Sequence, residues 1–267
     1  MISIIYVILW GLYVYLFTTM VNASWYFIIL WIISGAVASF ILTVLFIIAN
    51  FPIMKWTKFT NKYKYFLTRS TSEWLIFFFM RLKIDVEGRE NIPSDGPLCI
   101  YANHKSYADP FIVFHFMKRP TTFTPKMSVY KAPLIGLWLK YLGAFPIDRS
   151  SDRNTARAMV DAIKVIKAGM AMTIYPEGGI KDRDDVKMVA MRAGAYRVAM
   201  KAEANLLPVS IQGTTRIKYR APWRVTKIKV VIHPLVPYET IKEKTTAEVA
   251  DKMFHIINDR LIDEKAA

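Results

Sequence analysis

The first 54 residues of this 267-residue chain contain no Asp, Glu, Lys, Arg or His. That absence excludes an ordinary soluble segment, in which about a quarter of the residues are charged. Crossing ~30 Å of hydrocarbon at ~1.5 Å per residue takes about 20 residues, and residues 2–21 and 25–50 each supply that length. Asn22-Ala23-Ser24 predicts a turn between them. We expect a membrane-anchoring helical hairpin over residues 1–54, although one long tilted span also satisfies the length.

Cysteine is nearly absent too, since Cys99 is the only one. A single cysteine excludes an intramolecular disulfide, in keeping with a reducing compartment, and excludes a zinc cluster built on cysteines. The four histidines show no metal-ligand spacing. The sequence also lacks a G-x-G-x-x-G repeat, a P-loop, an H-E-x-x-H motif and a G-x-S-x-G nucleophile elbow. We therefore expect no metal ion and no bound cofactor.

Positive charge dominates the rest of the chain, whose formal net charge is +15 at pH 7. A basic cluster follows the charge-free stretch, and it comprises Lys55, Lys58, Lys62, Lys64 and Arg69. The positive-inside rule then predicts a cell-membrane protein whose remaining chain lies on the cytoplasmic side. Such a cluster attracts anionic headgroups by ~1 kcal/mol per basic residue. Nucleic acid is the less favoured partner, because the cluster adjoins a membrane segment and no nucleic-acid-binding motif is present.

Short strands and helices alternate after residue 80. A strand and a turn are expected at residues 85–93, and further strands at residues 98–102, 121–126, 170–175, 206–211 and 226–232. Helices are expected from residue 109 onward and at residues 133–142, 150–169, 187–202 and 247–261. This alternation predicts an α/β fold over residues 85–267, with a largely parallel mixed sheet flanked by helices. Residues 55–84 are expected to form a basic, apolar-rich membrane-proximal linker and helix. Its apolar run 74–80 suits either a core helix or a surface that docks on lipid.

The stretch from Asn103 to Pro110 joins a base-capable side chain to a carboxylate. The strand 98–102 would deliver His104 to its carboxyl edge, where open α/β sheets bind ligands. Asp109-Pro110 predicts a helix start, with Asp109 as N-cap and proline at the first helical position. On one helix, residues five apart would point about 140° from each other, so an intervening turn is needed for them to meet.

Two interpretations of this stretch stand side by side. In the first, Asp109 accepts a hydrogen bond from one imidazole nitrogen of His104, which leaves the other nitrogen free to take a proton from a substrate hydroxyl. In the second, Asp109 only caps its helix and His104 is a polar strand end. The octapeptide alone leaves both open, since a general base also needs an acceptor and a site.

Four stretches, in this order, resemble the conserved blocks of the glycerolipid acyltransferase family, whose best-known members are the 1-acyl-glycerol-3-phosphate acyltransferases. Residues 103–109 resemble its N-H-x-S-x-x-D block, which contains the H-x-x-x-x-D motif. Residues 143–149 resemble the block that ends in Ile-Asp-Arg, and residues 175–178 resemble F-P-E-G-T-R. Leu207-Pro208-Val209 resembles the fourth. The likeness runs from about residue 88 to residue 213.

The third block departs from the family pattern, because Gly179-Ile180 stand in place of Thr-Arg. In the family, that arginine is associated with phosphate binding. The resemblance therefore implies that Arg149 holds the acceptor phosphate alone or with Lys181 or Arg183, which follow the block.

The resemblance implies a membrane-bound enzyme that moves a fatty acyl group from an acyl thioester, acyl-CoA or acyl carrier protein, to the hydroxyl of 1-acyl-glycerol 3-phosphate (lysophosphatidic acid). The product would be phosphatidic acid. His104 would be the base and Asp109 its orienter. Glu177 would hold a glycerol hydroxyl or a basic partner, while Gly178 would let backbone N–H groups approach an anion.

Three alternatives remain at this point. The acceptor of an acyltransferase could be a lysophospholipid or glycerol 3-phosphate instead. A lipid hydrolase would use Ser106 as nucleophile beside His104, although the missing nucleophile elbow counts against it. A catalytically inactive relative would only bind lipid in the membrane.

Overall fold

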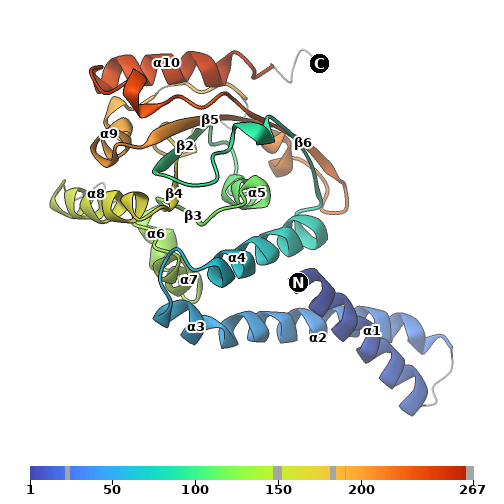
Figure 1. The fold of residues 1–267 in the computed structure, drawn as a ribbon. Coiled ribbons are helices and arrows are strands. Elements are labelled where there is room, and N and C mark those ends of the chain that lie inside the picture. Colours follow the sequence, from blue (N-terminus) through green and yellow to red (C-terminus); the bar gives the residue numbers. More distant parts are fainter. Residues whose placement is uncertain (22–24, 147–151, 181–184, 190, 263–267) are drawn as a thin grey trace.

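The computed structural model describes residues 1–21, 25–146, 152–180, 185–189 and 191–262 (Figure 1). Two apolar helices, α1 (Ile2–Met20) and α2 (Phe27–Ala49), form a hairpin that projects from one end of the molecule (Figure 1). They cross closely at Gly35, where an added Cβ would come within 2.8 Å of Tyr13. The predicted hairpin turn, residues 22–24, lies outside the described residues.

The helix α2 continues through α3 (Phe51–Trp56). By length and composition, Ile2–Met20 and Phe27–Trp56 can each cross a membrane. Only 11% of the apolar window of the first helix and 22% of that of the second are buried. This outward exposure differs from that of a core helix in a soluble protein and fits association with a membrane.

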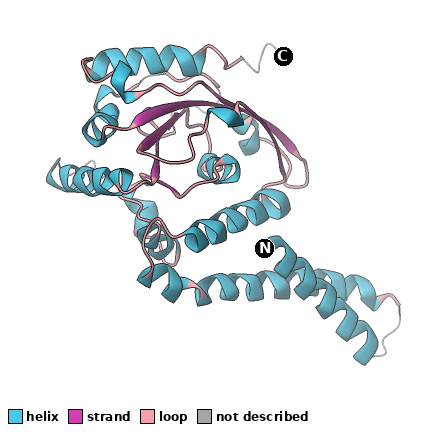
Figure 2. Ribbon diagram, viewed as in Figure 1, coloured by secondary structure: helices cyan, strands magenta, loops and turns pink. Residues whose placement is uncertain are grey.

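A six-stranded sheet forms the centre of the molecule (Figure 2, magenta). The strands are β1 (Leu82–Glu87), β2 (Leu98–Ala102), β3 (Thr121–Phe123), β4 (Ala171–Ile174), β5 (Asn205–Gln212) and β6 (Thr226–Ile232). Their order is β1-β6-β5-β2-β4-β3, and among these neighbours only β5 and β6 pair antiparallel. The prediction of a largely parallel mixed sheet flanked by helices is confirmed.

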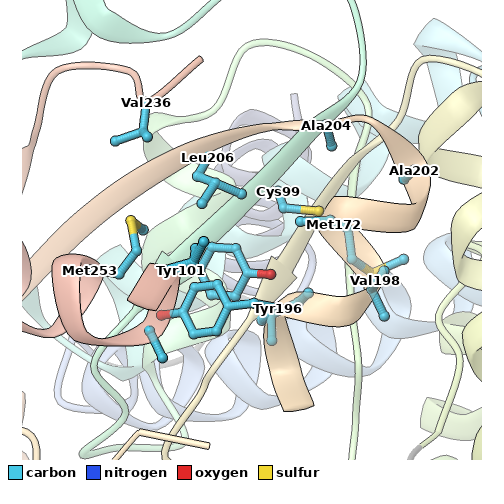
Figure 3. Close-up of a cluster of buried hydrophobic side chains, with 14 of the residues drawn as sticks. Cys99, Tyr101, Met172, Tyr196, Val198, Ala202, Ala204, Leu206, Val236 and Met253 are labelled. Carbon is cyan, nitrogen blue, oxygen red and sulfur yellow. The ribbon is translucent and has the colours of Figure 1, made fainter. Parts of the chain in front are cut away.

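Helices cover both faces of the sheet. On one face pack α8 (Asp152–Lys167), α9 (Arg197–Ala202) and α10 (Thr246–Asn258), whose apolar side chains meet those of β2 and β4. In this core Tyr101 stacks on Tyr196 with ring centroids 4.3 Å apart (Figure 3). On the other face lies α5 (Asp109–Phe116), through Ile112 and Phe116. The lone cysteine, Cys99, is fully buried in the first core.

The helix α4 (Lys62–Trp74) lies between α5 and the hairpin (Figure 1). Its Leu67 and Trp74 share a buried cluster with Ile2 and Tyr6 of α1, and the backbone N–H of Ile2 donates to Ser70 Oγ at 2.8 Å. The division of the chain at residues 54 and 84 stays a prediction. The root of the hairpin is nevertheless packed against the chain that follows it.

A π-helix, η1 (Leu75–Phe79), continues α4. Trp74 and Ile76 are buried, as expected of a core helix, whereas Phe77 is 68% exposed. Docking of the run on lipid stays a prediction. Smaller helices complete the described chain: η2 (Arg89–Asn91), α6 (Met127–Tyr130), α7 (Ile135–Tyr141), η3 (Ala193–Tyr196), η4 (Thr214–Lys218) and η5 (Tyr238–Thr240).

Two local predictions were wrong. The helix expected over residues 187–202 is present only as η3 and α9. The N–H of Arg192 donates to the carbonyl of Pro176 at 3.0 Å, and the carbonyl of Met188, its helical partner, accepts from the Asn258 side chain at 3.4 Å. The second concerns the start of α5, where Ala108 is the N-cap and Asp109 is the first helical residue. The Asp109 carboxylate does not cap its own helix, because it accepts bonds from the preceding loop.

Candidate active site

The loop that follows β2 is fixed by Asn103, which is almost fully buried. Its amide donates to the carbonyl of Ile211 at 2.8 Å and accepts from the N–H of Ile211 at 2.8 Å. The side chain thus extends the pairing of β2 with β5 by one further step while the backbone leaves the sheet. Because the chain turns away here, His104 lies at the carboxyl edge of β2.

His104 and Asp109 are joined by the predicted hydrogen bond, since Nδ1 of the imidazole lies 2.8 Å from Oδ2 of the carboxylate. Asp109 is fully buried, and the same oxygen accepts the N–H groups of Lys105 and Ser106, each at 2.9 Å. An ionised carboxylate only accepts hydrogen bonds, so Nδ1 carries the proton and Nε2 of the neutral ring has a free lone pair. The turn between the two residues therefore selects the tautomer that a general base needs.

The ring of Tyr175 stacks on the imidazole of His104, with centroids 4.1 Å apart and planes 18° from parallel. Tyr175 follows β4, the strand beside β2, so two neighbouring strands deliver the two rings to the same place. Burial raises the pKa of the Tyr175 phenol well above its usual range, which keeps the ring neutral. The stack and the Asp109 bond together fix the orientation of the imidazole.

A second charged pair contacts the loop on its buried side. Lys105 Nζ lies 3.2 Å from Glu177 Oε2, and both side chains are completely buried. The other oxygen of Glu177 accepts the N–H of His104 at 2.9 Å. Burial raises the pKa of Glu177, while the bonds from His104 and Lys105 act in the opposite direction. Glu177 therefore has a basic partner in Lys105, and its predicted role toward a glycerol hydroxyl stays a prediction.

Gly178 has a positive φ of +73°, a conformation that favours glycine. Its own N–H donates to the carbonyl of Tyr175 at 3.1 Å, and the approach of neighbouring backbone N–H groups to an anion stays a prediction. The space beside its Cα is taken by Arg192, whose Nε would lie 2.7 Å from an added Cβ. The N–H of Arg192 donates to the carbonyl of Pro176 at 3.0 Å.

Sequence reasoning missed Arg192. Its side chain is exposed, and among the described residues its guanidinium forms no ion pair or hydrogen bond. The only sequence signal is that the altered third block lacks its arginine. If phosphate binding is retained, another basic residue of the chain must supply it. The predicted phosphate-binding residues Arg149, Lys181 and Arg183 lie outside the described residues.

A cavity of about 330 Å³ lies beside the stacked rings. Tyr175 forms part of its wall, with apolar side chains from α8, β4 and α9, among them Met159, Ile174 and Val198. Arg192 and Arg197 line the same cavity and give it a basic side. The site therefore combines a base, an apolar chamber and an anion-attracting rim. Within the described ranges, no group of three His, Cys, Asp or Glu residues could hold a metal ion.

Ser106 is placed as a turn residue. Its Oγ accepts the N–H of Ala108 at 3.2 Å, and its own N–H is bonded to Asp109. Among the described residues, no hydrogen bond joins Ser106 Oγ to the imidazole of His104. These contacts disfavour the hydrolase interpretation.

A histidine and a carboxylate at the edge of an α/β sheet, beside an apolar chamber, suit acyl transfer, and the family model described as Acyltransferase matches residues 83–212, which contain both residues. The chain is 30% identical over 178 residues to the 1-acyl-sn-glycerol-3-phosphate acyltransferase of Borreliella burgdorferi, covering 64% of this chain and 70% of that one. This chain therefore belongs to the 1-acyl-sn-glycerol-3-phosphate acyltransferase family, which confirms the resemblance of the four blocks.

Two further similarities agree with this assignment. The chloroplastic 1-acyl-sn-glycerol-3-phosphate acyltransferase of Arabidopsis thaliana is 26% identical over 76% of this chain, which spans 56% of that protein. The crystal structure of the 1-acyl-sn-glycerophosphate acyltransferase PlsC from Thermotoga maritima aligns with a TM-score of 0.60 and 25% identity. That alignment covers 74% of this chain and 76% of the other, so the sheet and its helices are shared.

Proposed function

We propose that the protein transfers a fatty acyl group from an acyl thioester to the free hydroxyl of 1-acyl-glycerol 3-phosphate and forms phosphatidic acid at the cytoplasmic face of a membrane. The observation that supports this most directly is the 2.8 Å bond between His104 Nδ1 and Asp109, which leaves Nε2 as the proton acceptor. The names of the related proteins support the acceptor.

The reaction needs no covalent enzyme intermediate, because a thioester is already activated toward attack. Nε2 of His104 takes the hydroxyl proton of the acceptor while the oxygen attacks the thioester carbonyl carbon. The carbon–sulfur bond then breaks, and the thiolate leaves with the proton that the imidazolium returns. The buried Asp109 carboxylate stabilises the imidazolium between the two transfers. A positioned base contributes typically ~10²–10⁴-fold, and placement of both substrates supplies the rest.

The acceptor phosphate is held, in this proposal, by Arg149 with Lys181 or Arg183, and Arg192 adds a further guanidinium beside Gly178. Arginine suits this task because its planar fork binds two phosphate oxygens at once. Lys105 is excluded from it, since its ammonium is buried against Glu177. The apolar cavity beside Tyr175 suits the fatty acyl chain. The donor is acyl-CoA or acyl carrier protein, and neither a metal ion nor a cofactor takes part.

In this proposal, the charge-free hairpin and the basic residues after it contact the membrane. These keep the site beside a lipid-soluble acceptor and place anionic headgroups against Lys55 and Lys58, both of which lie outside the sheet domain.

The acceptor assignment is tested with purified full-length protein, given acyl-CoA or acyl carrier protein and a panel of acceptors, with products identified by mass. We expect the highest kcat/KM with 1-acyl-glycerol 3-phosphate. Arg149→Ala and Arg192→Ala should each lower it about ten- to more than a hundredfold, as for the loss of a charge-assisted contact, and Arg149→Lys should recover only part.

The matched control is Arg89→Ala, an exposed arginine that follows the far end of β1. It should leave kcat/KM unchanged. If the wild-type protein prefers a lysophospholipid with a choline or ethanolamine headgroup, or if Arg149→Ala slows both acceptors equally, the phosphate assignment fails and the lysophospholipid alternative replaces it.

A further inference from the structure

A second and larger cavity, of about 680 Å³, lies at the root of the hairpin. Its walls are aromatic and come from two elements, with Tyr6 and Trp10 on α1 and Phe77, Phe78 and Phe79 on η1. Arg81, Leu82 and Lys83 close one side, where β1 begins, and Val225 completes the wall. Within the described chain, the lining contains two basic side chains and no acidic one. The groove therefore pairs an apolar floor with a cationic rim.

The groove opens at the edge of the sheet that carries the His104–Asp109 pair. The strands β1 and β6 run antiparallel to β5 and β2, so the first residue of β1 and the last residue of β2 lie at the same edge. In the order β1-β6-β5-β2, the two strands are three steps apart, about 14 Å at ~4.8 Å per step. The groove is thus separate from the candidate active site but faces the same side.

Positive charge gathers at this rim, although Asp85 lies on the same side of β1 as Lys83. Burial and the neighbouring guanidinium of Arg81 lower the pKa of Arg220. Arg220 is fixed there, because it donates to the carbonyl of Met80, the residue before Arg81. Among the described residues, Arg81 and Lys83 form no ion pair. The sequence contains no Asp or Glu from residue 204 to residue 238, a stretch with six Lys and Arg residues. An anion at the rim would relieve this repulsion.

The surroundings of the groove match the level of lipid headgroups. Phe77, in the wall of the groove, is 68% exposed, and Trp223, two residues before Val225 in the chain, is 75% exposed. Exposed aromatic side chains are enriched at membrane interfaces. Other apolar side chains of α1 are exposed as well, among them Ile4 and Ile8. A water-soluble anion would gain nothing from the aromatic floor, and an uncharged lipid would gain nothing from the two cations. The combination fits an anionic phospholipid.

We infer that this groove binds one anionic phospholipid from the surrounding bilayer, with its acyl chains along Tyr6, Trp10 and Phe77 and its phosphate between Arg81 and Lys83. The inference rests on the membrane insertion of the hairpin given under the proposed function, but not on the transferase chemistry. A lipid bound there joins the root of the hairpin to the start of β1. It would hold the edge of the sheet that carries His104 against the membrane.

Native mass spectrometry of the full-length protein in detergent micelles tests the inference. The probes are dioleoyl phosphatidylglycerol and dioleoyl phosphatidylcholine, which share their chains and differ in charge. We expect one tightly bound phosphatidylglycerol per chain and at least ~10-fold weaker binding of phosphatidylcholine, as for the loss of a charge-assisted contact. Arg81→Gln with Lys83→Gln should abolish that preference, whereas Phe77→Ala should weaken both lipids together.

Two controls make the result decisive. Lys242→Ala with Lys252→Ala removes two exposed lysines at and just before α10, on the other side of the sheet, and should leave the preference intact. His104→Ala should also leave it intact, because the groove is separate from the dyad. Equal binding of the two lipids, or retention of the preference in the Arg81 and Lys83 variant, would overturn the inference. So would loss of lipid binding in His104→Ala, which would place the lipid in the active site, or displacement by inorganic phosphate alone.

Discussion

The hairpin and the loop after β2 present opposite kinds of side chain to their surroundings. In the hairpin, apolar side chains face outward, and Ile29 and Ile33 are 62% and 60% exposed. In the loop, charged side chains face inward, since Lys105 and Asp109 retain 2% and 0% of their exposure. Neither arrangement is the usual one for a protein in water, where apolar groups are buried and charges are solvated.

The difference shows what each region depends on. Exposed apolar surface of this extent is stable only in contact with lipid or another apolar surface, so the stability of the hairpin depends on what surrounds it. Buried charge is tolerated only when it is paired and hydrogen-bonded, so the loop depends on its fixed contacts. Removing a charge from the loop and adding one to the hairpin should therefore have different consequences. In the loop it should alter folding, and in the hairpin it should alter membrane insertion.

The largest effect is expected in the loop. Glu177→Ala leaves Lys105 buried without its partner and removes the acceptor of the His104 N–H, which should cost about 3–5 kcal/mol of the free energy of unfolding. Denaturant unfolding in detergent measures it. Combining Lys105→Met with Glu177→Leu should restore most of the loss, because no unpaired charge remains. A loss below about 1 kcal/mol in Glu177→Ala would mean that the pair is solvated.

The next effect is expected in the hairpin. Ile33→Lys puts a charge on an exposed face of α2, which should disfavour insertion by about 2.5–3.5 kcal/mol if that face lies in hydrocarbon. The measurement is the fraction of protein that stays with membranes after a carbonate wash. Trp25→Lys, next to the predicted turn, is the matched control and should have little effect, because its ammonium reaches water. Release of the wild-type protein by the same wash would contradict the two-span arrangement.

A smaller effect is expected at Gly178, which links the loop to the basic side of the cavity. Gly178→Ala forces a side chain into a left-handed conformation, worth ~1–2 kcal/mol, and displaces Arg192 as well. Gly96→Ala is the matched control, since its φ of +78° is similar and nothing lies within 4 Å of the added Cβ. Both variants should lose stability, but only Gly178→Ala should raise the KM for the acceptor. Identical KM values would show that Arg192 does not contact the acceptor.

The parts of the fold that depend on short-range pattern were predictable. Residues 98–102 are an apolar run that follows turn residues, and they form β2. Residues 226–232 alternate lysine with apolar side chains before an apolar end, and they form β6. The hydrogen bond between His104 and Asp109 was also predictable, because the two residues are five apart in the chain and only one turn separates them. Such features need only local spacing and the period of the backbone.

The contacts that the sequence did not reveal join residues far apart in the chain. Lys105 and Glu177 are 72 residues apart, so no periodic pattern in the sequence indicates that they pair. Helical spacing also misled at residues 187–202, where the carbonyl of Met188 accepts from Asn258, 70 residues away, and not from the N–H of Arg192. Arg192 meets Gly178 only because Pro176 binds its backbone. Tertiary contacts of this kind override local preference without changing the sequence pattern.

The central claim is that His104, oriented by Asp109, removes the acceptor proton. The most direct test is kcat at saturating donor and acceptor for His104→Ala, with Ser106→Ala as its neighbour in the same loop and with unfolding temperatures measured for both. We expect kcat to fall ~10²-fold or more in His104→Ala at an unchanged unfolding temperature, and to stay near the wild-type value in Ser106→Ala. A folded His104→Ala protein with near-normal turnover would contradict the general-base mechanism.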